Sequence, residues 1–177
     1  MIDDQRFASR RPDVLTFSTD PLNEDLTLAG PILADLVASL TTTDADFVVK
    51  LVDVYPTDAP DSWAAEGSKA VMGGYQQLVR AEILRGRYRN SFEKPEAFKP
   101  SEPTLVRFEL PDLLHTFRKG HRLMVQIQSS WFPLADRNTQ QFINIYEANP
   151  EDYIPSTIRI YHEAQRPSKL VVKVLPP

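Results

Sequence analysis

The chain has 177 residues, of which 42% are hydrophobic and 25% charged, and its formal net charge is -4. This length allows one domain that buries very roughly 70% of its unfolded surface. The negative charge offers no basic field to a phosphate backbone and disfavours nucleic-acid binding, while the lack of cysteine excludes disulfides and cysteine-ligated zinc.

The N-terminal residues 1–12 are charged and lack periodicity, and we interpret them as a linker or lead-in to one domain at residues 13–177. They are acidic and polar where a signal peptide would be basic and then apolar, and no apolar run approaches the roughly 18 residues of a membrane span. We therefore expect a soluble chain without a membrane partner. Any export signal would lie upstream, so the sequence assigns no compartment.

The first part of this domain is predicted to consist of strands, at residues 14–18, 26–28, 32–40 and 47–55. The stretch 32–40 is also compatible with a helix, but the threonines that follow it favour a continued strand. Near the end of 47–55, Val54 and Tyr55 compete for one core position, which indicates a β-bulge.

The middle of the chain is less regular. Residues 58–74 surround Trp63 without clear periodicity, and a connection of this length is usually functional or a packed strap. Residues 75–89 show both helical spacing and alternation, and propensity alone weakly favours a helix there. Residues 91–103 contain three prolines and are expected to form an extended strap.

The clearest strand pattern lies at residues 123–128. Leu123, Val125 and Ile127 alternate with polar or flexible neighbours, which predicts a strand that buries its apolar face and exposes Gln126 and Gln128 to solvent. Further short strands are expected at residues 105–110, 142–146, 157–161 and 170–175. About ten strands without a long helix predict an all-β sandwich or jelly roll.

No pattern in the sequence supports catalysis or cofactor binding. The G-x-S-x-G motif of α/β-hydrolases and the glycine-rich phosphate-binding loops are missing from the sequence, so we expect no cofactor. His115, His121 and His162 lack metal-binding spacing and are interpreted as turn or strand residues, although a Ser-His-Asp triad depends on geometry that sequence order cannot give.

Two further patterns leave alternatives open. The pair Asp44 and Asp46, like the acidic residues at 20–25, could bind calcium, but turn chemistry explains such clusters more often. The aromatic residues Trp63, Trp131 and Phe132 could stack on a sugar or plug the core. A stand-alone carbohydrate-binding sandwich is therefore the alternative interpretation.

Four stretches, taken in order, resemble the C-terminal jelly-roll domain of the X-Pro dipeptidyl-peptidase and cocaine esterase family. They are DPLNEDLTLAGP at 20–31, TDADFVVKLVDV at 43–54, RGRYR at 85–89 and KGHR at 119–122, followed by WFP at 131–133 and DRN at 136–138. The RGRYR and SSWFP forms are most similar to the α-amino-acid ester hydrolase and glutaryl-cephalosporin acylase branch.

This resemblance implies a galactose-binding-domain-like jelly roll, with strands at 75–89 and 32–40. It also implies a longer hydrolase with dipeptidyl-peptidase, esterase or acylase activity, whose triad lies in an upstream α/β-hydrolase domain followed by a cap. No triad residue has a counterpart here, so the chain alone is expected to be non-catalytic and to stabilise those domains. Any homo-oligomer would form through the parent enzyme.

Interdomain or pocket-edge contacts are hypothesised at five residues: Trp63, Tyr75, His121, Trp131 and Phe132. Within that set, the stretch 58–74 with Trp63 is the candidate edge of the active-site mouth. Arg85, Arg87 and Arg89 of the RGRYR stretch are expected to be structural, pairing with carboxylates or holding the strap that follows them. Cutting the domain free of its neighbours should also leave apolar side chains exposed.

Overall fold

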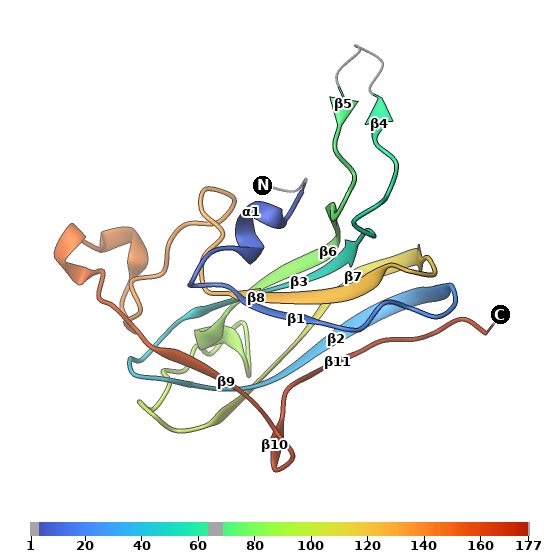
Figure 1. The fold of residues 1–177 in the computed structure, drawn as a ribbon. Coiled ribbons are helices and arrows are strands. Elements are labelled where there is room, and N and C mark those ends of the chain that lie inside the picture. Colours follow the sequence, from blue (N-terminus) through green and yellow to red (C-terminus); the bar gives the residue numbers. More distant parts are fainter. Residues whose placement is uncertain (1–3, 64–68, 177) are drawn as a thin grey trace.

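The computed structural model describes residues 4–63 and 69–176, and it contains two antiparallel sheets packed face to face (Figure 1). The first sheet contains, in spatial order, β1 (Leu15–Ser18), β8 (Arg122–Gln128), β3 (Asp46–Val54) and β6 (Gln76–Arg85). The predicted all-β sandwich is confirmed.

The second sheet is organised around β2 (Leu26–Leu40), the longest strand. One edge of β2 pairs with β7 (Thr104–Phe117). The other edge pairs with β9 (Ile158–Glu163) at residues 37–40 and with β11 (Lys169–Val171) at residues 33–35. β10 (Arg166–Pro167) pairs with β9, and a separate hairpin of β4 (Ser62–Trp63) and β5 (Lys69–Ala70) projects from the sandwich (Figure 1).

Four short helices complete the described chain: α1 (Arg6–Ser9), η1 (Gly86–Tyr88), η2 (Ile145–Glu147) and η3 (Pro150–Asp152). No helix within residues 4–63 and 69–176 is long and apolar enough to cross a membrane.

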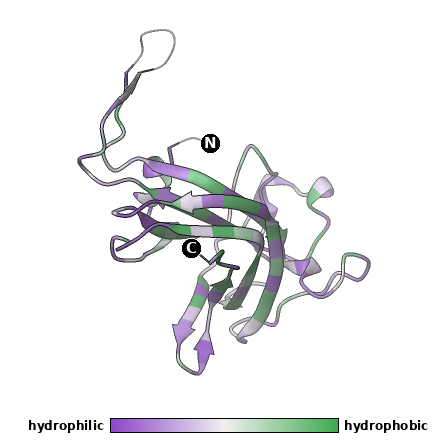
Figure 2. Ribbon diagram, turned by 90° about the vertical axis from the view of Figure 1, so that its right-hand side faces the viewer, coloured by the Kyte–Doolittle hydropathy of each residue, from purple (hydrophilic) through white to green (hydrophobic). Residues whose placement is uncertain are grey.

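The core lies between the sheets because the long strands alternate in polarity, which Figure 2 shows as alternating hydrophobic and hydrophilic residues. Inward-facing side chains from both sheets form one buried cluster, including Leu36, Leu40, Phe47, Leu51, Val106, Leu110 and Phe117. The two-residue period of the strands thus places one apolar face of each sheet against the other.

In residues 75–89, pairing with a neighbouring strand overrides the local propensity for a helix. They form β6, which pairs along its length with β3, and then η1. The helix favoured by propensity is wrong, and the strand implied by the family resemblance is confirmed up to Arg85. The bulge expected near the end of β3 is also present, but Val79 of β6 supplies the extra residue, because Leu51 pairs with Arg80 and Val52 with Leu78.

Two predictions about the strands are wrong. Gln126 and Gln128 were expected in solvent but are 0% and 6% exposed, because α1 and the chain after β8 cover the outer face of the first sheet. Residues 142–146 do not form a strand, since the Arg87 guanidinium takes the carbonyls of Gln141 and Ile143 that a strand would pair. The strand expected at 170–175 ends at Val171.

The lead-in packs against the sandwich. Gln5 and Ala8 are buried, and Asp4 forms a β-bridge with Gln77 of β6. A domain boundary at residue 12 stays a prediction.

Candidate interdomain surface

The segment between β8 and β9, residues 129–157, is the longest connection between two described strands and contains only η2 and η3 as regular structure. We call it the long loop. It is drawn in orange on one side of Figure 1. Connections of this length without strands are uncommon in compact domains and are usually functional.

Two buried carboxylates at the start of β3 hold the long loop in place. Asp44 and Asp46 are 0% and 2% exposed. The Asn138 side-chain amide donates to both of them, at 3.1 Å to Asp44 Oδ2 and 2.9 Å to Asp46 Oδ1. Burial raises the pKa of Asp46, although hydrogen bonds from Arg85 and Asn138 act in the opposite direction.

Two arginines connect the same carboxylates to the long loop. Arg87 Nε donates to Asp44 Oδ2 at 2.7 Å, while its terminal nitrogens donate to the carbonyls of Ile143 at 2.8 Å and Gln141 at 3.1 Å. Arg85 pairs with buried Asp46 and with Asp136 Oδ1 of the loop, at 3.2 Å. Because buried charges must be paired, these contacts fix the loop's path across the sandwich end.

Gly86 allows the two arginines to lie this close to β3. A Cβ at this position would be only 2.7 Å from the carbonyl oxygen of Ala45 and 2.7 Å from Phe98. Arg89, beyond it, holds the strap through the Glu96 carbonyl at 2.7 Å and lies 4.0 Å over the Phe98 ring. The structural role expected for the RGRYR arginines is confirmed by these contacts, and the carboxylates of Asp44 and Asp46 are engaged by arginine and asparagine side chains.

The long loop exposes large apolar side chains. Phe132 is 62% exposed and Tyr146 is 86% exposed. Four more residues of the loop belong to this set: Leu134, Phe142, Tyr153 and Ile154. Of these residues, sequence reasoning singled out only Phe132. The apolar character of Phe142 and Tyr146 was interpreted as the sign of a strand at 142–146. Exposed apolar groups that gather on one segment mark interaction surfaces.

Trp131, the neighbour of Phe132, is buried against a lysine. Its ring centroid lies 4.7 Å from Nζ of Lys50, which is itself fully buried in the centre of β3 and donates to Gln5 Oε1 at 2.9 Å. Burial lowers the pKa of Lys50 to about 8. With only 8% of its surface exposed, Trp131 offers no face to a sugar, so the stacking-platform interpretation is wrong for this residue.

Tyr75 and His121 lie together at the opposite end of β8. Both contact the ring of Tyr55, with centroid distances of 5.8 Å and 4.5 Å. His121 Nδ1 and His115 Nε2 each form a hydrogen bond with one oxygen of buried Asp53, at 2.8 Å and 2.9 Å. This arrangement braces the turn before β8 against β3 and β7.

The five sequence candidates therefore do not form one site. Trp131 and Phe132 follow β8, while Tyr75 and His121 lie where it begins. The backbone of Trp63 is described in β4, but its side chain lies outside what the structure describes. Their role in interdomain contacts stays a prediction.

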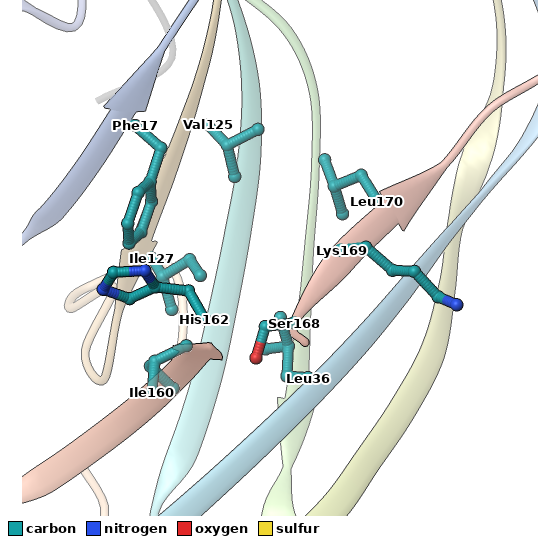
Figure 3. Close-up of a pocket in the computed structure, with 9 residues that line it drawn as sticks. All are labelled: Phe17, Leu36, Val125, Ile127, Ile160, His162, Ser168, Lys169 and Leu170. Carbon is teal, nitrogen blue, oxygen red and sulfur yellow. The ribbon is translucent and has the colours of Figure 1, made fainter. Parts of the chain in front are cut away.

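An apolar cavity of about 230 Å³ opens between the two sheets, lined by aliphatic side chains from β2, β8, β9 and β11 (Figure 3). Its polar neighbours are already engaged: Ser168 Oγ accepts from the Val37 amide at 2.9 Å, and the His162 ring packs edge-on against Phe17. Lys169 points away from the cavity. Among the lining residues that the structure describes, we find no nucleophile hydrogen-bonded to a base.

Metal binding has no support in the geometry either. Within the described ranges there is no group of three or more His, Asp or Glu side chains arranged to hold a metal ion.

Residues 2–171 match the family model of the X-Pro dipeptidyl-peptidase C-terminal non-catalytic domain. The chain is similar to cocaine esterase from Rhodococcus sp. (strain MB1 Bresler), with 33% identity over 172 residues, which are 97% of this chain and 27% of that protein.

Solved structures show the same relationship. The chain is similar to an α-amino acid ester hydrolase, with 46% identity and a TM-score of 0.90, covering 98% of this chain and 27% of that one. It is also similar to an aminopeptidase from a marine sediment archaeon, Thaumarchaeota archaeon, with 44% identity and a TM-score of 0.89, covering 99% and 28%. The chain thus spans little more than a quarter of these relatives.

Replacing Asn138 by Asp tests the buried carboxylate network. The change places a third carboxylate against Asp44 and Asp46, and we expect it to lower the free energy of unfolding at pH 7 by about 3–5 kcal/mol. Asn90→Asp is the matched control, because the exposed Asn90 also donates to a carboxylate, that of Glu96. Its expected cost in urea denaturation is below about 1 kcal/mol, and equal losses in the two variants would contradict this account.

Burial of Lys50 predicts a stability that rises at alkaline pH. Its folded pKa of about 8 lies below the ordinary 10.5. Between these values the folded chain has released a proton that the unfolded chain retains, so the free energy of unfolding increases with pH, by at most about 3 kcal/mol. Lys50→Met should remove this increase in denaturation curves between pH 8 and 10.5.

The control for Lys50 is Lys99→Met, because the Lys99 side chain is 81% exposed. If the pH dependence of stability is the same in Lys50→Met, Lys99→Met and the unaltered chain, the lowered pKa of Lys50 is refuted.

Proposed function

The chain belongs to the family of X-Pro dipeptidyl-peptidase C-terminal non-catalytic domains, and from this we propose that it completes and stabilises an upstream α/β-hydrolase domain and cap of a longer serine hydrolase. The observation that carries the proposal is the share of each relative that this chain covers. Relatives named as an esterase, an ester hydrolase and an aminopeptidase match this chain over nearly its whole length but over only 27% to 28% of theirs.

The residues of the chain are consistent with a supporting role. Its most prominent charged residues, Asp44, Asp46, Arg85 and Arg87, pair with one another and hold backbone. The sequence contains no nucleophile elbow. The bond-breaking groups of the proposed enzyme would therefore lie in the upstream domain, and its substrate would be an ester or amide.

A contribution to the active-site mouth is the finer part of the proposal. The hairpin of β4 and β5 projects away from both sheets (Figure 1). Projecting loops on a rigid sandwich commonly carry binding contacts. We therefore retain 58–74, with Trp63, as the candidate edge of the substrate pocket.

Hydrolysis assays on two polypeptides test this proposal. The isolated 177-residue chain should show no turnover of nitrophenyl esters or dipeptide amides, whereas the polypeptide from the whole reading frame should turn over one of these classes and be blocked by a serine-directed inhibitor. Inhibitor-sensitive turnover by the isolated chain would overturn the proposal. So would a whole reading frame that encodes no nucleophile elbow.

A further inference from the structure

We propose that the long loop, residues 129–157, is the surface on which the upstream catalytic domain docks, with Phe132 and Tyr146 as its main anchors. The inference rests on the proposed function, because it identifies the face that the supporting domain presents to its partner. It does not depend on the partner's substrate.

The first argument is the exposure of large apolar side chains. Phe132 and Tyr146 are 62% and 86% exposed, and Leu134 between them in sequence is 59% exposed. Aromatic side chains bury a large area on association and dominate the energetics of interfaces. These side chains therefore offer apolar anchors of the kind found in interface cores.

The second argument is that contacts within the chain hold the loop. Tyr153 lies under the Arg137 guanidinium at 4.9 Å, the Phe142 amide donates to Thr43 Oγ1 at 2.9 Å, and the Ile154 amide donates to the Thr139 carbonyl. A surface already held in one conformation loses little entropy on association. Such fixation of exposed apolar groups favours binding.

The third argument identifies the occupant. Lys50 Nζ lies 6.0 Å from the centroid of the Phe7 ring and 4.7 Å from that of the Trp131 ring, so the lead-in and the start of the long loop both contact Lys50. Figure 1 shows α1 beside the loop. An upstream domain joined through the lead-in would be tethered next to this surface at a high effective concentration.

The hairpin of β4 and β5 is the competing surface. Its described residues Ser62, Lys69 and Ala70 are exposed but small or charged, and Lys69 pairs with Asp61 at 2.6 Å. They supply none of the aromatic anchors found on the long loop.

The test compares the same substitutions in two contexts. The double variant Phe132→Ser with Tyr146→Ser should leave the isolated 177-residue chain unchanged, because both side chains are exposed there. In the polypeptide from the whole reading frame it should lower the midpoint of thermal inactivation by at least about 2 °C, since an apolar contact is lost. Leu114→Ser is the matched control, because Leu114 is 74% exposed on β7, away from the loop.

The outcomes separate the two proposals. If the double variant has no more effect than Leu114→Ser in the whole polypeptide, docking through the long loop is refuted, while inhibitor-sensitive hydrolysis by that polypeptide would still uphold the proposed function. If the double variant destabilises the isolated chain as much as the whole polypeptide, the two side chains support the loop's own fold and the docking proposal is again refuted.

Discussion

The loop end of this sandwich depends on pairing two carboxylates that lie out of reach of water. Asp46 begins β3 and Asp44 lies two residues before it, and each needs partners because an unpaired buried charge is costly. Their partners come from the end of β6, from η1 and from Asn138 of the long loop. One small cluster therefore joins three segments that are far apart in the sequence, and the loop's exposed aromatic residues take their positions from it.

A second polar contact extends this arrangement to the lead-in. Lys50 lies in the middle of the first sheet, where an apolar residue would be expected, and it is covered by Gln5 and by the ring of Trp131. The lead-in and the long loop therefore share one buried amine, whose pKa is lowered by the same burial. Polar groups on this outer face connect the sandwich to the two segments that we assign to contact with an upstream domain.

The sequence was sufficient to predict the sandwich, most strands and the family, because alternation and the RGRYR and KGHR stretches depend on local residues alone. It was insufficient for Gln126 and Gln128, since the lead-in and the chain after β8 cover them and no local pattern reports such cover. Residues 142–146 have strand propensity, yet Arg87 takes their backbone partners. Of the residues in the long loop, the sequence analysis singled out only Trp131 and Phe132 as candidate contacts. Trp131 is buried against Lys50. Exposure of Tyr146 depends on how a loop is anchored, which the sequence does not reveal.

The central claim is that buried charge pairs hold a preformed apolar surface for a catalytic domain of the same polypeptide. Hydrogen–deuterium exchange, compared between the isolated chain and the polypeptide from the whole reading frame, tests it most directly. We predict that backbone amides at residues 132–154 exchange more slowly in the whole polypeptide, with little change on β7 near Leu114. Unchanged exchange at 132–154, with new protection confined to the hairpin of β4 and β5, would contradict the account.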